Sequence, residues 1–167
     1  PEFMIHREFT GREALRTYAF WIFTLVFCLN GVYATAFSFH AVDVAREAGL
    51  LASTFFRLFL VMTVFNIPTG FFIGWLTGRT CLRYSLWIMV ASMGVSSAGL
   101  ILMPTTAGLL MFVVGGGISW GCFGTLMAVV YPRYFGRKHL GKISGWSMLA
   151  LVLSSAVAPL IWSISQG

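Results

Sequence analysis

The sequence predicts an all-α membrane protein with five transmembrane helices, and three observations support this prediction. The 167 residues are 58% hydrophobic and only 10% charged, whereas an ordinary soluble domain carries about 25% charged residues. Apolar runs of about 18 residues or more, enough to cross the roughly 30 Å hydrocarbon core of a bilayer, recur along the chain. Strand-like alternation of apolar and polar residues is absent, so we expect helices, which satisfy their own backbone hydrogen bonds in lipid.

The chain before the first apolar run is polar and is expected to stay outside the membrane. Residues 1–3 precede a methionine and resemble the remnant of a cloning site. Residues 4–17 are expected to form a cytoplasmic N-terminal segment, too charged for a secretory signal peptide. A five-helix transmembrane domain is expected over residues 18–165. Its helices are predicted at about 18–39, 53–76, 84–103, 107–131 and 144–165.

The basic residues between the helices predict the orientation of the chain. Counted in order along the sequence, the N-terminal segment and the four connections carry 3, 1, 2, 0 and 4 Lys or Arg residues. Because cytoplasmic loops are enriched in Lys and Arg, the N-terminus is predicted to be cytoplasmic and the C-terminus to lie outside. The expected location is a bacterial inner membrane, with the lipid bilayer as the surrounding partner.

No cofactor, metal or nucleic acid is expected. Cys28, Cys81 and Cys122 lack the spacing of a metal site or a disulfide framework. The sequence has no glycine-rich lysine loop for ATP. The net charge of +6 is spread over three segments rather than along one stripe, which argues against nucleic-acid binding.

The second connection carries a short motif that can be compared with a known loop signature. Residues 74–83 read Gly-Trp-Leu-Thr-Gly-Arg-Thr-Cys-Leu-Arg. This run resembles the loop signature of the major facilitator superfamily, Gly-x-Leu-Ala-Asp-Arg with a basic residue four positions on. Gly74, Leu76, Arg79 and Arg83 match that signature, and Gly78 stands at its acidic position.

Three further stretches resemble the monocarboxylate and oxalate:formate branch of the same superfamily. They are residues 9–17, residues 39–40 with 47–49, and residues 131–145. The resemblance implies the C-terminal half of a twelve-helix transporter, helices seven to eleven, with the twelfth missing. Substrate in that fold is held between two halves near the midplane of the membrane. One wall of the site would then come from a second half-transporter or from a second copy of this chain.

Arg57 is the only charged residue inside a predicted span, where it would cost about 2.5 to 3.5 kcal/mol at the helix centre. Intramembrane charges mark functional sites, so Arg57 is a candidate anchor for the carboxylate of an anionic substrate. Alternatively, it lies at the outer interface and extends its guanidinium to water, because residues 58–76 alone can span. The residue at the position of the family's substrate arginine is Ile67, before Pro68.

Four other polar residues are candidates for the solute pathway. Asn30 and Tyr33 share one face of the first helix, and Asn66 lies two residues before Pro68, where a break in the helix could expose carbonyls to a cavity. Helix–helix hydrogen bonding is the alternative role for all three. His40 is a candidate for coupling transport to the movement of protons. The alternative is that it lies hydrated at the membrane interface.

Glycines at four-residue spacing predict close helix packing in the last two spans. They are Gly117, Gly121 and Gly124 in the fourth helix and Gly141 and Gly145 at the start of the fifth. A sliding interface for alternating access is the alternative role of these residues.

The expected function is secondary transport of a small organic solute, in particular a mono- or dicarboxylate, by alternating access. The alternatives are a non-transporting membrane module that binds a partner and a half-transporter that must pair. A remote alternative is an intramembrane serine hydrolase, because residues 117–121 match G-x-S-x-G around Ser119. That pattern acts at a strand-to-helix turn, whereas an apolar helix is predicted here, so no enzyme activity is expected.

Overall fold

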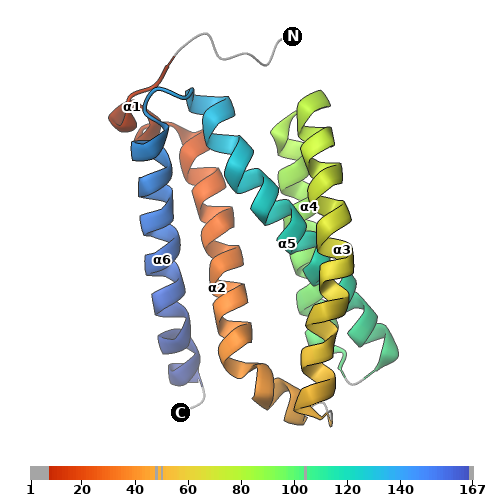
Figure 1. Ribbon diagram of the computed structural model, residues 1–167. Coiled ribbons are helices and arrows are strands. Elements are labelled where there is room, and N and C mark those ends of the chain that lie inside the picture. The colour runs from red at the N-terminus through yellow and green to blue at the C-terminus, as the bar shows by residue number, and fades with distance from the viewer. Residues whose placement is uncertain (1–7, 48, 50, 104, 166–167) are drawn as a thin grey trace. The chain divides into compact units, whose positions relative to one another are not determined.

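The computed structural model describes residues 8–47, 49, 51–103 and 105–165 (Figure 1). Helices account for most of this part of the chain, and it contains no strand. The helices are α1 Gly11–Leu15, α2 Tyr18–Glu47, α3 Ala52–Arg79, α4 Leu82–Ile101, α5 Thr106–Phe135 and α6 Leu140–Ser165.

Five of these helices are long and apolar enough to cross a membrane, which confirms the predicted helical class and the predicted number of candidate spans. This criterion uses length and composition alone. The candidate spans are Tyr18–Phe39, Phe55–Arg79, Leu82–Ile101, Thr106–Phe135 and Leu140–Val157. The five spans are compatible with an integral membrane protein.

Helices α2, α3, α5 and α6 extend beyond the apolar runs that predicted them, whereas α4 begins and ends two residues earlier than predicted. Helix α2 continues to Glu47 and α6 begins at Leu140, whereas the predicted helices ended at residue 39 and began at residue 144. Intrahelical hydrogen bonds form in water as well as in lipid, so the end of an apolar run does not end a helix. Helix α5 ends where Gly136 adopts a positive φ of 83° and its N–H donates to the Pro132 carbonyl, 3.2 Å away.

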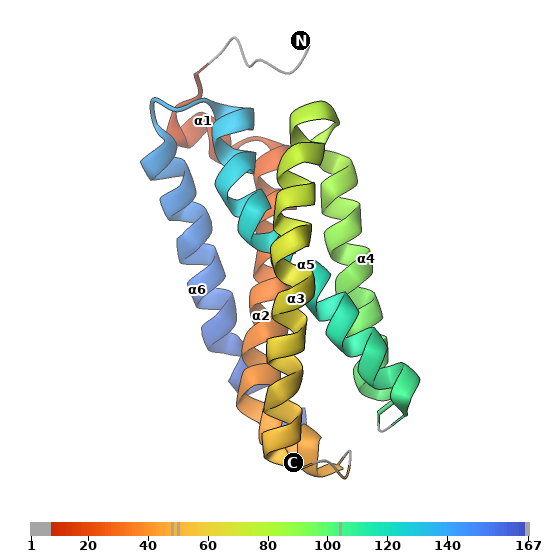
Figure 2. The same ribbon diagram turned by 45° about the vertical axis from the view of Figure 1, so that its right-hand side comes forward.

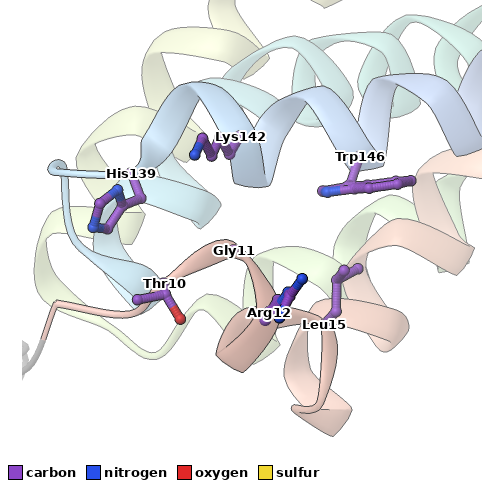
Figure 3. A pocket seen from close by; sticks show the side chains of 7 residues that line it. All are labelled: Thr10, Gly11, Arg12, Leu15, His139, Lys142 and Trp146. Atoms are coloured by element: carbon purple, nitrogen blue, oxygen red, sulfur yellow. The ribbon is translucent and has the colours of Figure 1, made fainter.

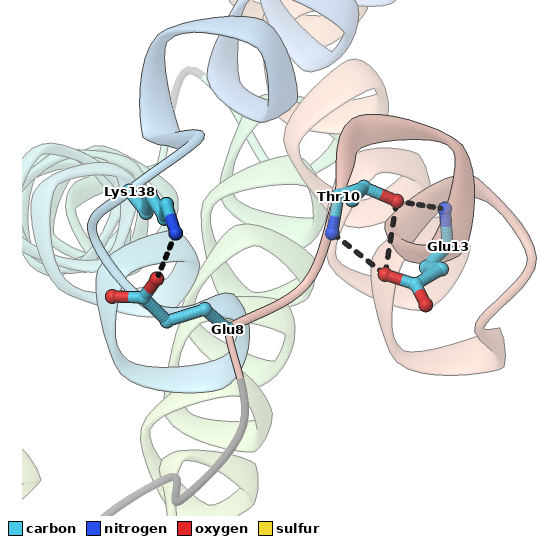
Figure 4. Close-up of polar contacts among 4 residues, drawn as sticks. All are labelled: Glu8, Thr10, Glu13 and Lys138. Carbon is cyan, nitrogen blue, oxygen red and sulfur yellow. Dashed lines mark hydrogen bonds and ion pairs between the residues drawn. The ribbon is translucent and has the colours of Figure 1, made fainter.

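Helix α1 lies within the polar N-terminal segment, where no helix was predicted. A capping box starts it: the backbone N–H of Glu13 donates to Thr10 Oγ1 at 3.4 Å, and the Thr10 N–H donates to Glu13 Oε2 at 2.8 Å (Figure 4). Ala14 is fully buried. This one-turn helix is therefore an ordered element with a buried side, not a solvated tail.

The chain divides into two compact units. The first unit comprises residues 1–39 and 127–167, and the second comprises residues 40–126. Each unit is described by itself.

A hydroxyl cluster within an aromatic core holds the first unit together. Tyr131 of α5 is 1% exposed, and its hydroxyl shares hydrogen bonds with Thr24 of α2, at 3.2 Å, and with Ser147 of α6. The ring of Tyr131 also contacts Phe20 and Phe27, with centroids 6.0 and 6.1 Å away. One side chain thus joins three helices through both its ring and its hydroxyl.

Replacing Tyr131 with phenylalanine is expected to destabilise the protein by about 1 to 2 kcal/mol, because Thr24 and Ser147 lose their shared partner while the ring contacts remain. Thermal unfolding in detergent, followed by tryptophan fluorescence, measures this. Tyr134→Phe is the matched control, since Tyr134 lies on the same helix but is exposed. Equal shifts of the two unfolding midpoints would contradict the role of the buried hydroxyl.

A seam of small residues joins α4 to α5 in the second unit. The buried residues of α4 recur at alternating steps of three and four: Leu82, Ser85, Met89, Ser92, Ser96 and Gly99. The Ser96 hydroxyl donates to the Phe112 carbonyl at 3.1 Å. In Figure 2, α4 ends and α5 begins at the same short connection. Small side chains on both helices allow their backbones to touch.

Candidate functional site

A groove between α3 and α5 lies near the middle of both helices. Its volume is about 350 Å³. Both helices are candidate spans, so the groove lies between two apolar segments. Its lining residues are Asn66, Ile67, Gly70 and Phe71 of α3, and Trp120, Gly121, Gly124 and Thr125 of α5.

Glycine and threonine of α5 set the close approach that forms the groove. A Cβ added at Gly121 would lie 2.6 Å from the Asn66 carbonyl oxygen and 3.1 Å from the Gly70 nitrogen. The Thr125 hydroxyl donates across the contact to the Gly70 carbonyl at 3.1 Å. The floor of the groove is therefore backbone, and only a residue without a side chain fits at position 121.

The groove offers neutral polar groups within aromatic walls. Asn66 is half-buried and its amide carries both donors and an acceptor. Trp120, which is 47% exposed, adds an indole N–H, and Phe71 adds an apolar surface. None of the lining residues is charged. The groove is thus suited to hydrogen bonding with a small polar solute, and it supplies no cation of its own.

Arg57 and Asn66 do not meet in this groove. Arg57 is exposed and lies in the second turn of α3. Nine residues separate it from Asn66, which amounts to two and a half helical turns and a rise of about 14 Å. The two side chains therefore leave opposite sides of α3. The interfacial alternative for Arg57 fits this position better than a contact with solute in the groove.

The candidates on α2 lie elsewhere. Asn30 is 3% exposed within the first unit. Tyr33 is half-buried and stacks on Phe37, with ring centroids 6.4 Å apart. Neither residue lines the groove. For His40 the structure gives the backbone position in α2, while its side chain lies outside the described part.

The loop motif occupies the end of α3 and the start of α4. The guanidinium of Arg79 lies over the Trp75 ring, 4.5 Å from its centroid. The Leu76 carbonyl accepts hydrogen bonds from the Thr80 N–H and hydroxyl, at 2.8 and 2.9 Å. Arg83, on the first turn of α4, is exposed. Gly74 lies one turn before Gly78, and a Cβ added there would meet Thr125 at 3.9 Å.

The predicted packing glycines fall into two groups. A Cβ at Gly117 would lie 2.6 Å from the Met62 carbonyl oxygen, so Gly117 and Gly121 both lie at the α3–α5 contact. A Cβ at Gly124, Gly141 or Gly145 would meet no atom of the described chain within 4 Å.

The sequence did not point to the α5 residues that line the groove with Asn66, and the α4 seam was not predicted. Trp120 and Thr125 read as ordinary members of an apolar helix, and no local signal marks them. The α4 seam did have a signal, because Ser85, Ser92 and Ser96 recur at helical spacing. Small polar residues on one face of an apolar helix indicate a close helix contact.

The G-x-S-x-G run lies within α5. Ser119 is 1% exposed, and the helix continues on both sides of it. A nucleophile elbow, by contrast, needs a sharp turn that projects the serine hydroxyl into an open site.

Comparison with known proteins supplied no relative: no protein-family model, curated protein or solved structure matches this chain. The resemblance to the major facilitator superfamily therefore depends on the motifs of the chain itself. The groove and those motifs are the basis for assigning a function.

Proposed function

We propose that this chain is the C-terminal half of a major facilitator transporter that moves a small organic solute by alternating access. The groove between α3 and α5 is the observation that carries the proposal. Hydrogen-bonding groups in the middle of membrane spans are costly and mark substrate pathways. Here Asn66 and Trp120 present such groups at one opening, at mid-length of two candidate spans.

The loop motif and the charge pattern support the same proposal. Residues 74–83 cover the end of one candidate span and the start of the next, where the signature of the superfamily lies, and carry Arg79 and Arg83. The alternation of basic residues among the connections supports a cytoplasmic N-terminus and an external C-terminus in a bacterial inner membrane. A second half-transporter, or a second copy of this chain, would complete the site.

The chemistry of the groove bears on the substrate. A mono- or dicarboxylate is the class that the resemblance implies. Because no lining residue is charged, its carboxylate would accept hydrogen bonds from the Asn66 amide and the Trp120 indole. Any cation that pairs with it would come from the opposing half. The groove volume of about 350 Å³ suits a solute of a few carbon atoms.

Replacing Asn66 with alanine is expected to weaken solute binding about tenfold, since it removes a hydrogen bond from a mid-membrane site. Binding of labelled lactate, oxalate and formate to the detergent-purified chain measures this, together with uptake into liposomes. Thr63→Ala is the matched control on α3, because the Thr63 hydroxyl bonds to its own helix at the Phe59 carbonyl, 3.0 Å away.

Two results would count against the transporter. Equal binding by the Asn66→Ala and Thr63→Ala variants would remove the groove from the solute pathway. An absence of saturable binding and uptake, combined with a stable heteromeric complex on native gels, would favour a membrane module that binds a partner.

A further inference from the structure

A second cavity lies in the first unit, between the α1 segment and the start of α6 (Figure 3). Its volume is about 620 Å³. We call it the basic pocket. Its lining residues are Thr10, Gly11, Arg12, Leu15, His139, Lys142 and Trp146.

Specific contacts hold the α1 segment against α5 and α6. The Phe9 N–H donates to the Phe135 carbonyl at 3.1 Å, and the two rings meet edge to face at 5.6 Å. A Cβ added at Gly11 would lie 3.5 Å from Lys142 Cβ, so α1 and α6 touch at this point. Figures 1 and 2 both show α1 beside the start of α6. The basic pocket is therefore built by tertiary packing.

The basic pocket has a positive charge that no lining carboxylate neutralises. Arg12 and Lys142 face it from two different helices, and His139 adds an imidazole. Neither of the nearest acidic residues lines the basic pocket: Glu8 pairs with Lys138 at 3.7 Å, and Glu13 accepts hydrogen bonds from Thr10 at the edge of the pocket (Figure 4). Two cations at one cavity favour an anion that accepts several hydrogen bonds, as phosphate does.

The other wall of the basic pocket is apolar and continues onto a candidate span. Trp146 is 51% exposed and lies on α6, within the span Leu140–Val157. Leu15 ends α1, and its carbonyl accepts a hydrogen bond of 2.8 Å from the indole of Trp21, near the start of the span Tyr18–Phe39. Tryptophan beside basic residues at the ends of spans is typical of the membrane–water interface.

From this arrangement we infer that the basic pocket binds the headgroup of an anionic phospholipid. The phosphate lies between Arg12 and Lys142, and the acyl chains run along Trp146 and the apolar face of α6. A soluble anion would use the two cations but would leave the apolar wall beside the span uncovered. The inference is independent of solute transport, since the groove and the basic pocket share no residue.

The test is binding of single lipids to the 167-residue chain in detergent, counted by native mass spectrometry. The probes are dioctanoyl phosphatidylglycerol, dioctanoyl phosphatidylcholine and glycerol 3-phosphate. The chain is expected to prefer phosphatidylglycerol over phosphatidylcholine, and the double variant Arg12→Gln/Lys142→Gln should bind it about 20-fold more weakly. Higher salt should weaken binding as well, because the attraction is electrostatic.

The matched control is Arg16→Gln/Arg137→Gln, which removes the same charge from exposed residues outside the basic pocket. It should keep the lipid preference, and so should the conservative variant Arg12→Lys. Circular dichroism of each variant checks that the helices are retained. Equal losses in the two double variants, or equal binding of the two lipids, would overturn the inference. Binding of glycerol 3-phosphate as tight as that of the lipid would identify a soluble anion instead.

Discussion

Replacing Gly115 with valine is expected to destabilise the protein by about 3 kcal/mol. A Cβ at this position of α5 would lie 2.6 Å from the Ser96 nitrogen and 2.7 Å from the Ser92 carbonyl oxygen. Both are backbone atoms, which cannot rotate away as a side chain can, so α4 and α5 must separate. Their separation also breaks the hydrogen bond from the Ser96 hydroxyl to the Phe112 carbonyl. Thermal unfolding in detergent measures the loss.

The control for Gly115 is Gly94→Val on α4. Gly94 is exposed, and an added Cβ would meet nothing within 4 Å. Because glycine is a poor helix former, this substitution should leave stability unchanged or raise it slightly. An unfolding midpoint of Gly115→Val equal to that of Gly94→Val would show that the α4–α5 backbones are not in contact.

The five candidate spans could be predicted because lipid leaves an apolar segment few choices. A run such as residues 107–131 must satisfy its backbone internally, and a helix does so with local hydrogen bonds alone. The helix ends could not be read from hydropathy in the same way. Helix α5 ends at Phe135, four residues beyond its apolar run and directly before a glycine with positive φ, because backbone geometry decides where a helix stops.

Helix α1 has a local sequence signal for its start, although the many charged residues around it led to the prediction of a polar segment without a helix. Thr10 and Glu13 have the spacing of a capping box, and the structure contains both of its hydrogen bonds. The docking of this segment on α5 and α6 had no such signal. Phe9 and Phe135 are far apart in the sequence, and their pairing depends on how the helices pack.

The groove illustrates the same limit at the candidate site. Asn66 was identified because an amide in an apolar run is unusual. Trp120 and Thr125 line the same groove but belong to α5, and the sequence does not predict how α5 packs against α3. Helical periodicity alone separates Arg57 from Asn66, since nine residues make two and a half turns. Side chains on opposite sides of one straight helix cannot both contact a small solute, so Arg57 and Asn66 do not form one site.

Replacing Gly121 with valine is expected to cost about 2 to 3 kcal/mol and to close the groove. A Cβ there would lie 2.6 Å from the Asn66 carbonyl oxygen, 2.8 Å from Thr69 Cβ and 3.1 Å from the Gly70 nitrogen. Helix α3 must move away, which also breaks the hydrogen bond from the Thr125 hydroxyl to the Gly70 carbonyl. We therefore expect a lower unfolding midpoint in detergent and a loss of lactate, oxalate or formate binding.

The variant Gly124→Val separates the loss of stability from the loss of solute binding. Gly124 lines the same groove, but a Cβ there would meet nothing within 4 Å of the described chain. Its valine side chain should narrow the groove without pushing α3 from α5, so solute binding falls while the unfolding midpoint is retained. A Gly121→Val protein as stable as Gly124→Val would contradict the close backbone contact between α3 and α5. If Gly124→Val bound solute as well as the unsubstituted chain, the groove would not be the solute site.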